Sequence, residues 1–237
     1  MATPDSTPPA ARLDQVLARL RASARPEQLA GMARFGMTPD RRLGISVPVL
    51  RRLGKELGPD HALAQGLWDS AIPDAQILAA YVAEPARFTA RQMDQWIRGM
   101  TAWDTCDQAC SNAFARTPLA WGRVPVWARR APEFERRAAF ALIAALAVHD
   151  KRAEDAKFVA LLPLIEAAAD DERNFVKKAV NWALRQIGKR NAGLLSAAIA
   201  CAEGLRQRPS RAARWIAADA LRELTGDAMQ RRLRARA

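Results

Sequence analysis

Apolar residues recur three and four positions apart along most of the chain, the spacing of one face of an α-helix. Leu13, Val16, Leu17 and Leu20 predict a first helix over residues 10–23. Proline, glycine and capping residues divide the next stretch, where we expect helices at about 26–35, 46–57, 60–69, 73–82, 89–100 and from 103 onward. Thr117-Pro118 opens a further helix, which Pro125 must kink or split. No stretch alternates apolar and polar residues as a strand would, so the predicted fold class is all-α.

The second half of the chain contains an internal repeat. The segment that begins at Phe134 (FERRAAFAL) returns at Phe175 (FVKKAVNWAL), 41 residues later, and a weaker third copy sets Arg211 33 residues after Lys178. Partner helices are expected at about 153–168 and 192–205, with a last short helix after Gly226. Helix pairs that repeat every 30–45 residues are typical of a right-handed superhelical solenoid of HEAT-like repeats. We expect a disordered tail over residues 1–9 and a single domain over residues 10–237.

A solenoid of this kind predicts where certain side chains point. Equivalent helices of successive repeats line one concave face, so Arg137, Lys178 and Arg211 should point the same way. Trp182 and Arg185 follow one turn after Lys178 on the same stripe. A ladder of cations on a concave face fits duplex DNA, contacted through its phosphates rather than its bases.

The charge of the chain supports an anionic partner. The net charge is +12 and the isoelectric point about 10.8. Residues 1–115 carry 13 basic against 12 acidic side chains, whereas residues 116–237 carry 24 against 13. Almost all of the excess therefore lies in the second half, where a surface that follows a phosphate backbone would place it. The alternative is a solvated, arginine-rich surface without a ligand.

Several other protein classes are disfavoured. Three cysteines, Cys106, Cys110 and Cys201, make no disulfide framework, and no second ligand pair stands near them to complete a zinc site. The first residues are proline-rich without an apolar core, unlike a secretory signal, and the longest apolar run, 138–148, is too short to span a bilayer. We therefore expect a soluble cytoplasmic protein without a zinc site.

One stretch carries candidate chemistry. On a helix, Trp103 and Asp107 stand four positions apart and share a face, which sets an indole beside a carboxylate. If Trp182 lies opposite Trp103, two indoles and one carboxylate can hold a cation or a sugar that is becoming positive. Asp104 stands at the helix start, where its charge is stabilised, so it is better suited as a cap or an orienting group than as an acid. The plain alternative is a capped helix with Trp103 in the core and Trp182 buried between Lys178 and Arg185.

In the repeat interpretation, Trp215 takes the core position of the third repeat, flanked by Arg211 and Arg214.

If Asp107 is the only working carboxylate, it would suffice only for a leaving group that needs no protonation.

Five segments together resemble the AlkD-like DNA alkylation-repair glycosylases, over most of the chain. They are 32–35 (MARF), 38–42 (TPDRR), 103–107 (WDTCD), 137–139 (RAA) and 178–185 (KAVNWALR). The resemblance implies a superhelix of HEAT-like repeats that hydrolyses the N-glycosidic bond of cationic N3- and N7-alkylated purines. It implies that Asp107 is the catalytic carboxylate, that Trp103 and Trp182 flank the sugar of the lesion, and that Arg137 lies near the site. It also implies that no metal or nucleotide is needed and that the base is not flipped into a pocket, unlike in most base-modifying enzymes.

The partner expected from charge and resemblance together is double-stranded DNA that contains alkylated purines. The residues expected to contact it are Phe35, Arg41, Arg42, Lys177, Lys178, Arg185, Lys189, Arg211 and Arg214. Phe35 stands where the best-known members have a tyrosine, so a hydroxyl contact to DNA is lost there. We expect a monomer in the bacterial cytosol, associated with the nucleoid when bound to DNA. The alternatives are a non-catalytic binder of damaged or branched DNA and, less in keeping with the charge, a protein–protein scaffold.

Overall fold

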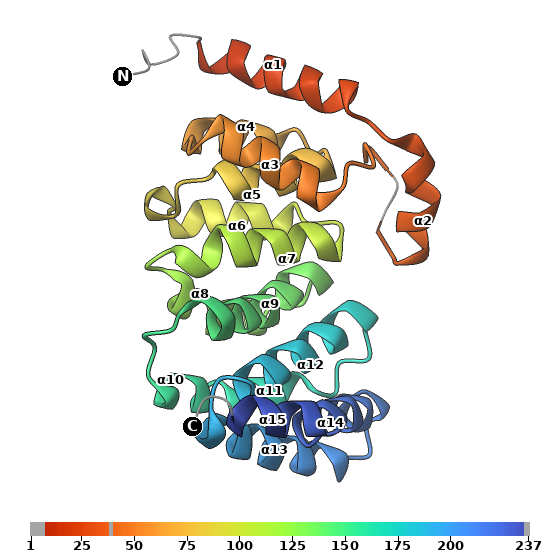
Figure 1. The fold of residues 1–237 in the computed structure, drawn as a ribbon, viewed down its shortest axis with the longest axis vertical. Coiled ribbons are helices and arrows are strands. Elements are labelled where there is room, and N and C mark those ends of the chain that lie inside the picture. Colours follow the sequence, from red (N-terminus) through yellow and green to blue (C-terminus); the bar gives the residue numbers. More distant parts are fainter. Residues whose placement is uncertain (1–7, 38–39, 235–237) are drawn as a thin grey trace. The chain divides into compact units, whose positions relative to one another are not determined.

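The computed structural model describes residues 8–37 and 40–234, and every regular element in this part of the chain is a helix (Figure 1). The all-α prediction is therefore confirmed. The chain divides into two compact units, Met1–Ala113 and Phe114–Ala237. The single domain expected over residues 10–237 stays a prediction, and each unit is described here by itself.

The first unit is built around helix α5. Its helices are α1 (Pro9–Ala22), α2 (Leu29–Arg34), α3 (Val47–Leu57), α4 (His61–Asp69), α5 (Pro73–Val82), α6 (Ala90–Arg98) and α7 (Trp103–Asn112), with 3-10 turns at Pro26–Gln28 and Pro85–Arg87. Helix α5 packs against α3, α4 and α7, and nearly all of its residues are buried. It is thus the element that brings α3 and α7 together.

Capping residues and aromatic side chains explain why these short helices are stable. The Asp60 carboxylate accepts a hydrogen bond from the main-chain N–H of Leu63 and so caps α4. Thr89 and Gln92 form a reciprocal capping box at the start of α6. Trp68 of α4 and Trp96 of α6 stack with ring centroids 4.1 Å apart, which joins these two helices through buried aromatic surface.

The second unit consists of two layers of helices. Its elements are a 3-10 turn (Phe114–Arg116), α8 (Ala120–Ala128), α9 (Glu133–His149), α10 (Asp155–Val159), α11 (Leu162–Ala168), α12 (Asn174–Gly188), α13 (Ala192–Arg206), α14 (Arg211–Leu224) and α15 (Asp227–Arg234). Helix α12 packs against both α9 and α14, while α8 packs against α9, α11 against α12, and α13 against α12 and α14 (Figure 1). The apolar run 138–148 lies in α9, where Ala138 to Ala147 are all buried.

The repeat is present with one change of register. Helices α9 and α12 begin 41 residues apart, at Glu133 and Asn174, as the sequence predicts. Helix α14 begins at Arg211, only 37 residues after α12, so the fifth residues of the three helices are Arg137, Lys178 and Trp215. The expected equivalence of Arg211 with Lys178 was therefore wrong by one helical turn. Arg211 still lies on the corresponding face of α14, because it stands four positions before Trp215 and positions four apart share one helix face.

Three predicted boundaries also differ. Helix α1 begins at Pro9, inside the expected tail 1–9, of which residues 1–7 lie outside the described residues. The helix expected at 26–35 is a 3-10 turn followed by the short α2. The helix expected at 153–168 is divided into α10 and α11, and Pro163 explains the break because its ring favours the first turn of a new helix. Pro125 lies inside α8 without splitting it into two helices.

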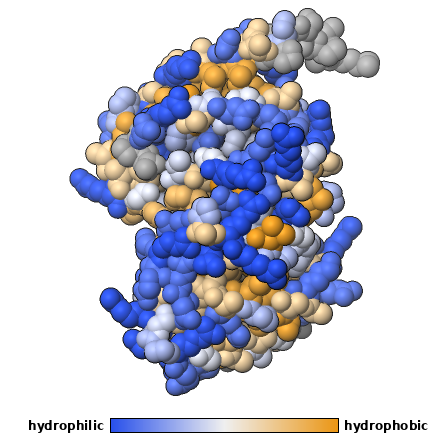
Figure 2. All heavy atoms as spheres, turned by 180° about the vertical axis from the view of Figure 1, so that it is seen from behind, coloured by the Kyte–Doolittle hydropathy of each residue, from blue (hydrophilic) through white to orange (hydrophobic). Residues whose placement is uncertain are grey.

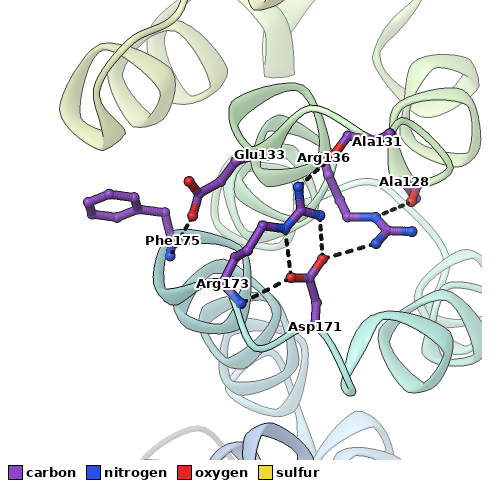
Figure 3. A network of polar contacts seen from close by, with 7 residues as sticks. All are labelled: Ala128, Ala131, Glu133, Arg136, Asp171, Arg173 and Phe175. Carbon is purple, nitrogen blue, oxygen red and sulfur yellow. Dashed lines mark hydrogen bonds and ion pairs between the residues drawn. The ribbon is translucent and has the colours of Figure 1, made fainter.

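An acidic residue between α11 and α12 joins the first two repeats (Figure 3). The Asp171 carboxylate accepts hydrogen bonds from Arg136 Nη1 at 2.9 Å and from Arg173 Nε at 2.8 Å, and Arg173 also donates to the carbonyl of Ala131. Burial alone would raise the pKa of Asp171, but the hydrogen bonds from Arg173 and Arg136 outweigh it and lower this pKa to about 2. Asp171 therefore stabilises the second unit as a carboxylate.

Replacing Asp171 by Asn should destabilise the second unit in a pH-dependent way. The pKa of Asp171 is lower in the folded than in the unfolded chain, so its contribution is complete above about pH 4 and is lost as the pH falls towards 2. We expect Asp171→Asn to lower the free energy of unfolding at pH 7 by roughly 1–2 kcal/mol, after allowance for solvent screening. Urea unfolding followed by circular dichroism at several pH values measures this.

The neighbouring Asp170 provides the control. Its exposed carboxylate lies 3.3 Å from Arg208, so Asp170→Asn should cost less than about 1 kcal/mol. Equal losses for the two variants, or a loss at Asp171 that does not change with pH, would contradict the role given to Asp171.

Candidate functional site

Helix α7 brings Trp103 and Asp107 to one helix face. Trp103 is the first residue of the helix and is half-buried, and Asp107 follows one turn later, also half-buried. The indole Nε1 of Trp103 donates a hydrogen bond to the main-chain carbonyl of Phe35 at 2.9 Å. This hydrogen bond restricts the rotation of the Trp103 side chain and so fixes the indole on the helix face that also carries Asp107.

The other carboxylate of this stretch has a different partner. Asp104 is buried and forms a two-pronged ion pair with Arg42, whose Nη1 and Nη2 lie 2.7 and 3.0 Å from the two carboxylate oxygens. The side chains of Arg42 and Asp104 are only 2% and 9% exposed. Asp104 thus does not cap α7 but binds Arg42. Arg42 was predicted to contact DNA. Its burial in this pair means that it does not lie on an exposed surface where it could do so.

The loop that carries Arg42 is fixed a second time by helix α5. The buried carboxylate of Asp74 accepts hydrogen bonds from the main-chain N–H groups of Leu43 and Ile45, both at 2.7 Å. Gly44 lies between them with φ of 78°, and a Cβ atom there would approach the carbonyl oxygen of Arg25 to 2.3 Å. These contacts hold the loop 40–46 in the conformation that brings Arg42 to Asp104.

Two residues before and inside this loop are exposed. Phe35 is 72% exposed although its carbonyl holds Trp103, and Arg41 is exposed with a left-handed φ of 54°. Both therefore stay available as predicted DNA contacts of the first unit. Thr38 and Pro39 of the same predicted segment lie outside the described residues.

In the second unit, Arg137 is buried rather than exposed. Its Nη1 donates to the carbonyl of Phe175, in the first turn of α12, at 2.6 Å. This contact joins α9 to α12, and the rings of Phe134 and Phe175 stack beside it with centroids 5.4 Å apart. The structure thus places Arg137 between helices.

The cations of α12 differ in their surroundings. Lys178 is exposed and Trp182 is half-buried. Arg185 and Lys189 are both held by the Glu223 carboxylate of α14, and the Asp219 carboxylate lies 3.7 Å from Arg185. Burial tends to raise the pKa of Glu223, but Lys189 and Arg185 lower it below its usual value, so Glu223 stays ionised at neutral pH.

Asp219 and Glu223 were missed in the sequence, although the repeat contains a signal for them. They follow Asn181 and Arg185 by 38 residues each, close to the distance between helices α12 and α14. Asn181 donates to Asp219 at 2.6 Å. In this chain, an acidic residue that follows a basic or amide residue by about one repeat length thus indicates a contact between neighbouring repeats.

The remaining predicted contacts lie around α14. Arg211 and Arg214 are exposed, and Arg214 donates to the carbonyl of Pro209 at 2.8 Å. Trp215 is 39% exposed rather than in the core, and the Lys177 ammonium lies 5.1 Å from the centroid of its ring. The expectation of a core position for Trp215 was therefore wrong.

The predicted site residues therefore fall into two groups, one in each unit. Phe35, Arg41, Arg42, Trp103, Asp104 and Asp107 belong to the first, and Arg137, Lys177, Lys178, Trp182, Arg185, Lys189, Arg211 and Arg214 to the second. The expectation that Trp182 lies opposite Trp103 concerns residues of different units and stays a prediction. In the described part of the chain, no cluster of His, Cys, Asp or Glu is suited to a metal ion, and no helix there is both long and apolar enough to cross a membrane.

Comparison with known proteins now assigns the family. Residues 16–224 match the family described as DNA alkylation repair enzyme. The chain belongs to this family. No curated protein matches it in sequence.

Two solved structures match this chain, one of them closely in fold. One is from a new family of proteins related to the HEAT-like repeat DNA glycosylases with affinity for branched DNA structures, with a TM-score of 0.73, 16% identity and coverage of 89% of this chain and 94% of that chain. The other is a designed armadillo repeat protein in complex with a (KR)4 peptide, at a TM-score of 0.35 and 15% identity over 78% of this chain and 79% of that chain. The first match shows that this DNA alkylation repair enzyme family member has a HEAT-like repeat fold, as the sequence predicts.

Removing the charge of Asp104 should destabilise the first unit strongly. Asp104→Asn leaves the Arg42 guanidinium buried with a neutral partner, and breaking a buried pair in this way costs about 3–5 kcal/mol. Urea unfolding monitored by circular dichroism gives this loss directly. Asp69→Asn, on the exposed end of α4, is the matched control and should change stability by less than about 0.5 kcal/mol. A loss at Asp104 no larger than that at Asp69 would show that the Arg42 pair does not support the unit.

Proposed function

We propose that the protein is a DNA glycosylase that hydrolyses the N-glycosidic bond of cationic N3- and N7-alkylated purines in duplex DNA. The observation that carries this proposal is the α7 helix face, where the half-buried Asp107 carboxylate stands one turn from the indole of Trp103. Membership of the DNA alkylation repair enzyme family supports it. The proposal also explains the excess of 24 basic over 13 acidic side chains in residues 116–237, since DNA is the substrate.

The chemistry requires only one working carboxylate. An N-alkylated purine already carries a positive charge, so the C1′–N bond breaks with its electron pair moving to the base, which leaves neutral. The sugar becomes positively charged at C1′, and a nearby carboxylate stabilises that charge. A water molecule then adds its oxygen to C1′ and gives up a proton, which Asp107 can accept.

The surrounding residues serve position and charge in this scheme. The face of the Trp103 indole attracts the developing cation, by roughly 0.5–2 kcal/mol for such a contact. Because Trp103 is held by the Phe35 carbonyl, its ring needs little ordering when DNA binds. We assign Trp182 to the same sugar on the strength of the family resemblance, and we assign the exposed Lys178 and Arg41 to phosphates of the duplex. Since Arg137 contacts a main-chain carbonyl, we give it a positioning role for α12 rather than a catalytic one.

On the strength of the family resemblance, we propose that the base is released without being flipped into a pocket, and its positive charge means that no acid of the protein has to protonate it. A neutral damaged base lacks the positive charge that makes it a good leaving group, so such lesions should not be released. The reaction consumes only water, and we propose that a monomer carries it out in the cytoplasm.

A second candidate is a non-catalytic protein that binds damaged or branched DNA. It is favoured by the fold similarity to the solved protein with affinity for branched DNA structures. Both candidates share a surface that binds phosphates, and they differ in whether a base is released. Binding that did not weaken between 50 and 200 mM salt would contradict both, because neutralising several phosphates releases counterions.

The decisive test of the reaction is base release from a duplex that contains one N7-methylguanine. The wild type should liberate the free base, measured by liquid chromatography, whereas Asp107→Asn should be slower by roughly 100- to 1,000-fold because the charge on the sugar is no longer stabilised. Both should bind the duplex with similar affinity. The exposed Asp69→Asn variant and a duplex with a neutral lesion serve as controls, the first expected to be fully active and the second to stay intact.

Absence of base release by the wild type on both N3- and N7-alkylated purines would refute the glycosylase proposal. If the same preparation bound branched DNA, the non-catalytic candidate would replace it.

A further inference from the structure

Trp215 on α14 is an exposed indole of the second unit, and it lines a hollow surrounded by charged side chains. Trp215 is the fifth residue of its helix, the position taken by Lys178 in α12, and 39% of its surface is exposed. A hollow of about 300 Å³ lies beside it, lined by Glu172, Lys177, Arg211, Arg214 and Trp215. All five residues belong to the second unit, so the hollow is complete within it.

The charges around this hollow favour an anion. Lys177 and Arg211 form no ion pair within residues 8–37 and 40–234, so both positive charges are available. Arg214 donates to the carbonyl of Pro209, which keeps its guanidinium at the rim. The one acid, Glu172, accepts a hydrogen bond at 2.9 Å from the main-chain N–H of Ala212 and is thereby directed at the start of α14.

The Trp215 indole adds an aromatic surface, which is not needed for binding phosphates alone. The Lys177 ammonium lies 5.1 Å from the centroid of the Trp215 ring, so the ring already holds a cation at its face. A flat nucleobase stacks on such a ring, whereas the paired bases of an intact duplex keep their faces covered. A hollow of about 300 Å³ is at the lower end of ligand-binding pockets and suits one nucleotide rather than a double helix.

We propose that Trp215, Lys177 and Arg211 form a binding site for one unpaired nucleotide of DNA, whose base stacks on the Trp215 indole and whose phosphate binds Lys177 and Arg211. The Lys177 ammonium moves from the ring to the phosphate when the base takes its place. The site rests on the proposed function only in that DNA is the partner, and it does not require that a base be excised. It gives the protein a preference for DNA in which helix pairing is interrupted.

The test compares two fluorescein-labelled DNAs with the full chain: a blunt 20-base-pair duplex and the same duplex with a five-nucleotide single-stranded overhang. Fluorescence anisotropy at a fixed salt concentration gives the two affinities. The wild type should bind the overhang DNA about tenfold more tightly, as expected for one stacked base. Trp215→Ala should lose this difference while its affinity for the blunt duplex stays within about twofold, and Trp215→Phe should keep most of it.

The control and the charge variants complete the design. Val159→Ala removes another exposed apolar side chain of the same unit, which is 46% exposed, and should change neither affinity. Lys177→Gln and Arg211→Gln should each reduce the salt dependence for the overhang DNA by about 0.7 in the slope of log K against log salt. These two variants keep Trp215 in place, so they test the site even if Trp215→Ala folds poorly.

Each remaining outcome decides against the site. Equal affinity of the wild type for blunt and overhang DNA, or a preference that survives in Trp215→Ala, would overturn it. A poly-glutamate peptide that competes for the site as well as an oligothymidylate would show that it takes acidic chains in general. No binding of any DNA would refute the proposed function as well, whereas release of N7-methylguanine together with an unchanged preference in Trp215→Ala would refute this inference alone.

Discussion

The buried ion pair between Arg42 and Asp104 is the contact on which the first unit depends. It joins residues 62 positions apart, and both side chains are almost fully removed from water. Such a pair is stable only when its geometry is good, and here both guanidinium nitrogens meet both carboxylate oxygens. The pair fixes the loop 40–46 against the first turn of α7, at the point where Asp74 binds the same loop from α5. The candidate chemistry of Trp103 and Asp107 begins on that same helix turn.

The second unit uses polar contacts between repeats for the same purpose. Glu133 accepts from the main-chain N–H of Phe175, and Glu172 accepts from that of Ala212, so an acid of one repeat binds the helix start of the next. At the other helix ends, Arg190 and Arg208 donate to carbonyls of the preceding repeat, those of Ala147 and Glu166. Many arginines of the basic half are thus structural. Hydrophilic side chains cover much of the face shown in Figure 2, and apolar ones lie among them in separate patches.

The sequence was sufficient for the parts of the fold that local patterns determine. Helical spacing and the starts of α4 and α6 near residues 60 and 89 follow from residues close together in the chain, and the 41-residue repeat between α9 and α12 follows from two similar segments. The common helix face of Trp103 and Asp107 follows from the same periodicity. The surroundings of the charged residues could not be predicted, because Arg42, Arg137 and Arg185 meet partners 38 to 62 residues away. Periodicity could not predict the exposure of Trp215 either. Moving the alignment of α14 with α12 by one helical turn leaves the same residues on the same face, so the pattern does not reveal the shift.

In the proposed function, the two aspartates of α7 have separate roles: Asp104 holds the first unit together, and Asp107 takes part in the reaction. The most direct test is the single-turnover rate of N7-methylguanine release by Asp104→Asn and Asp107→Asn, each with excess enzyme and each corrected for its folded fraction. We predict that folded Asp107→Asn releases base at least about 100-fold more slowly than the wild type, whereas folded Asp104→Asn stays within about tenfold of the wild-type rate. The reverse pattern, with the larger rate loss at Asp104 and an active Asp107→Asn, would contradict this assignment.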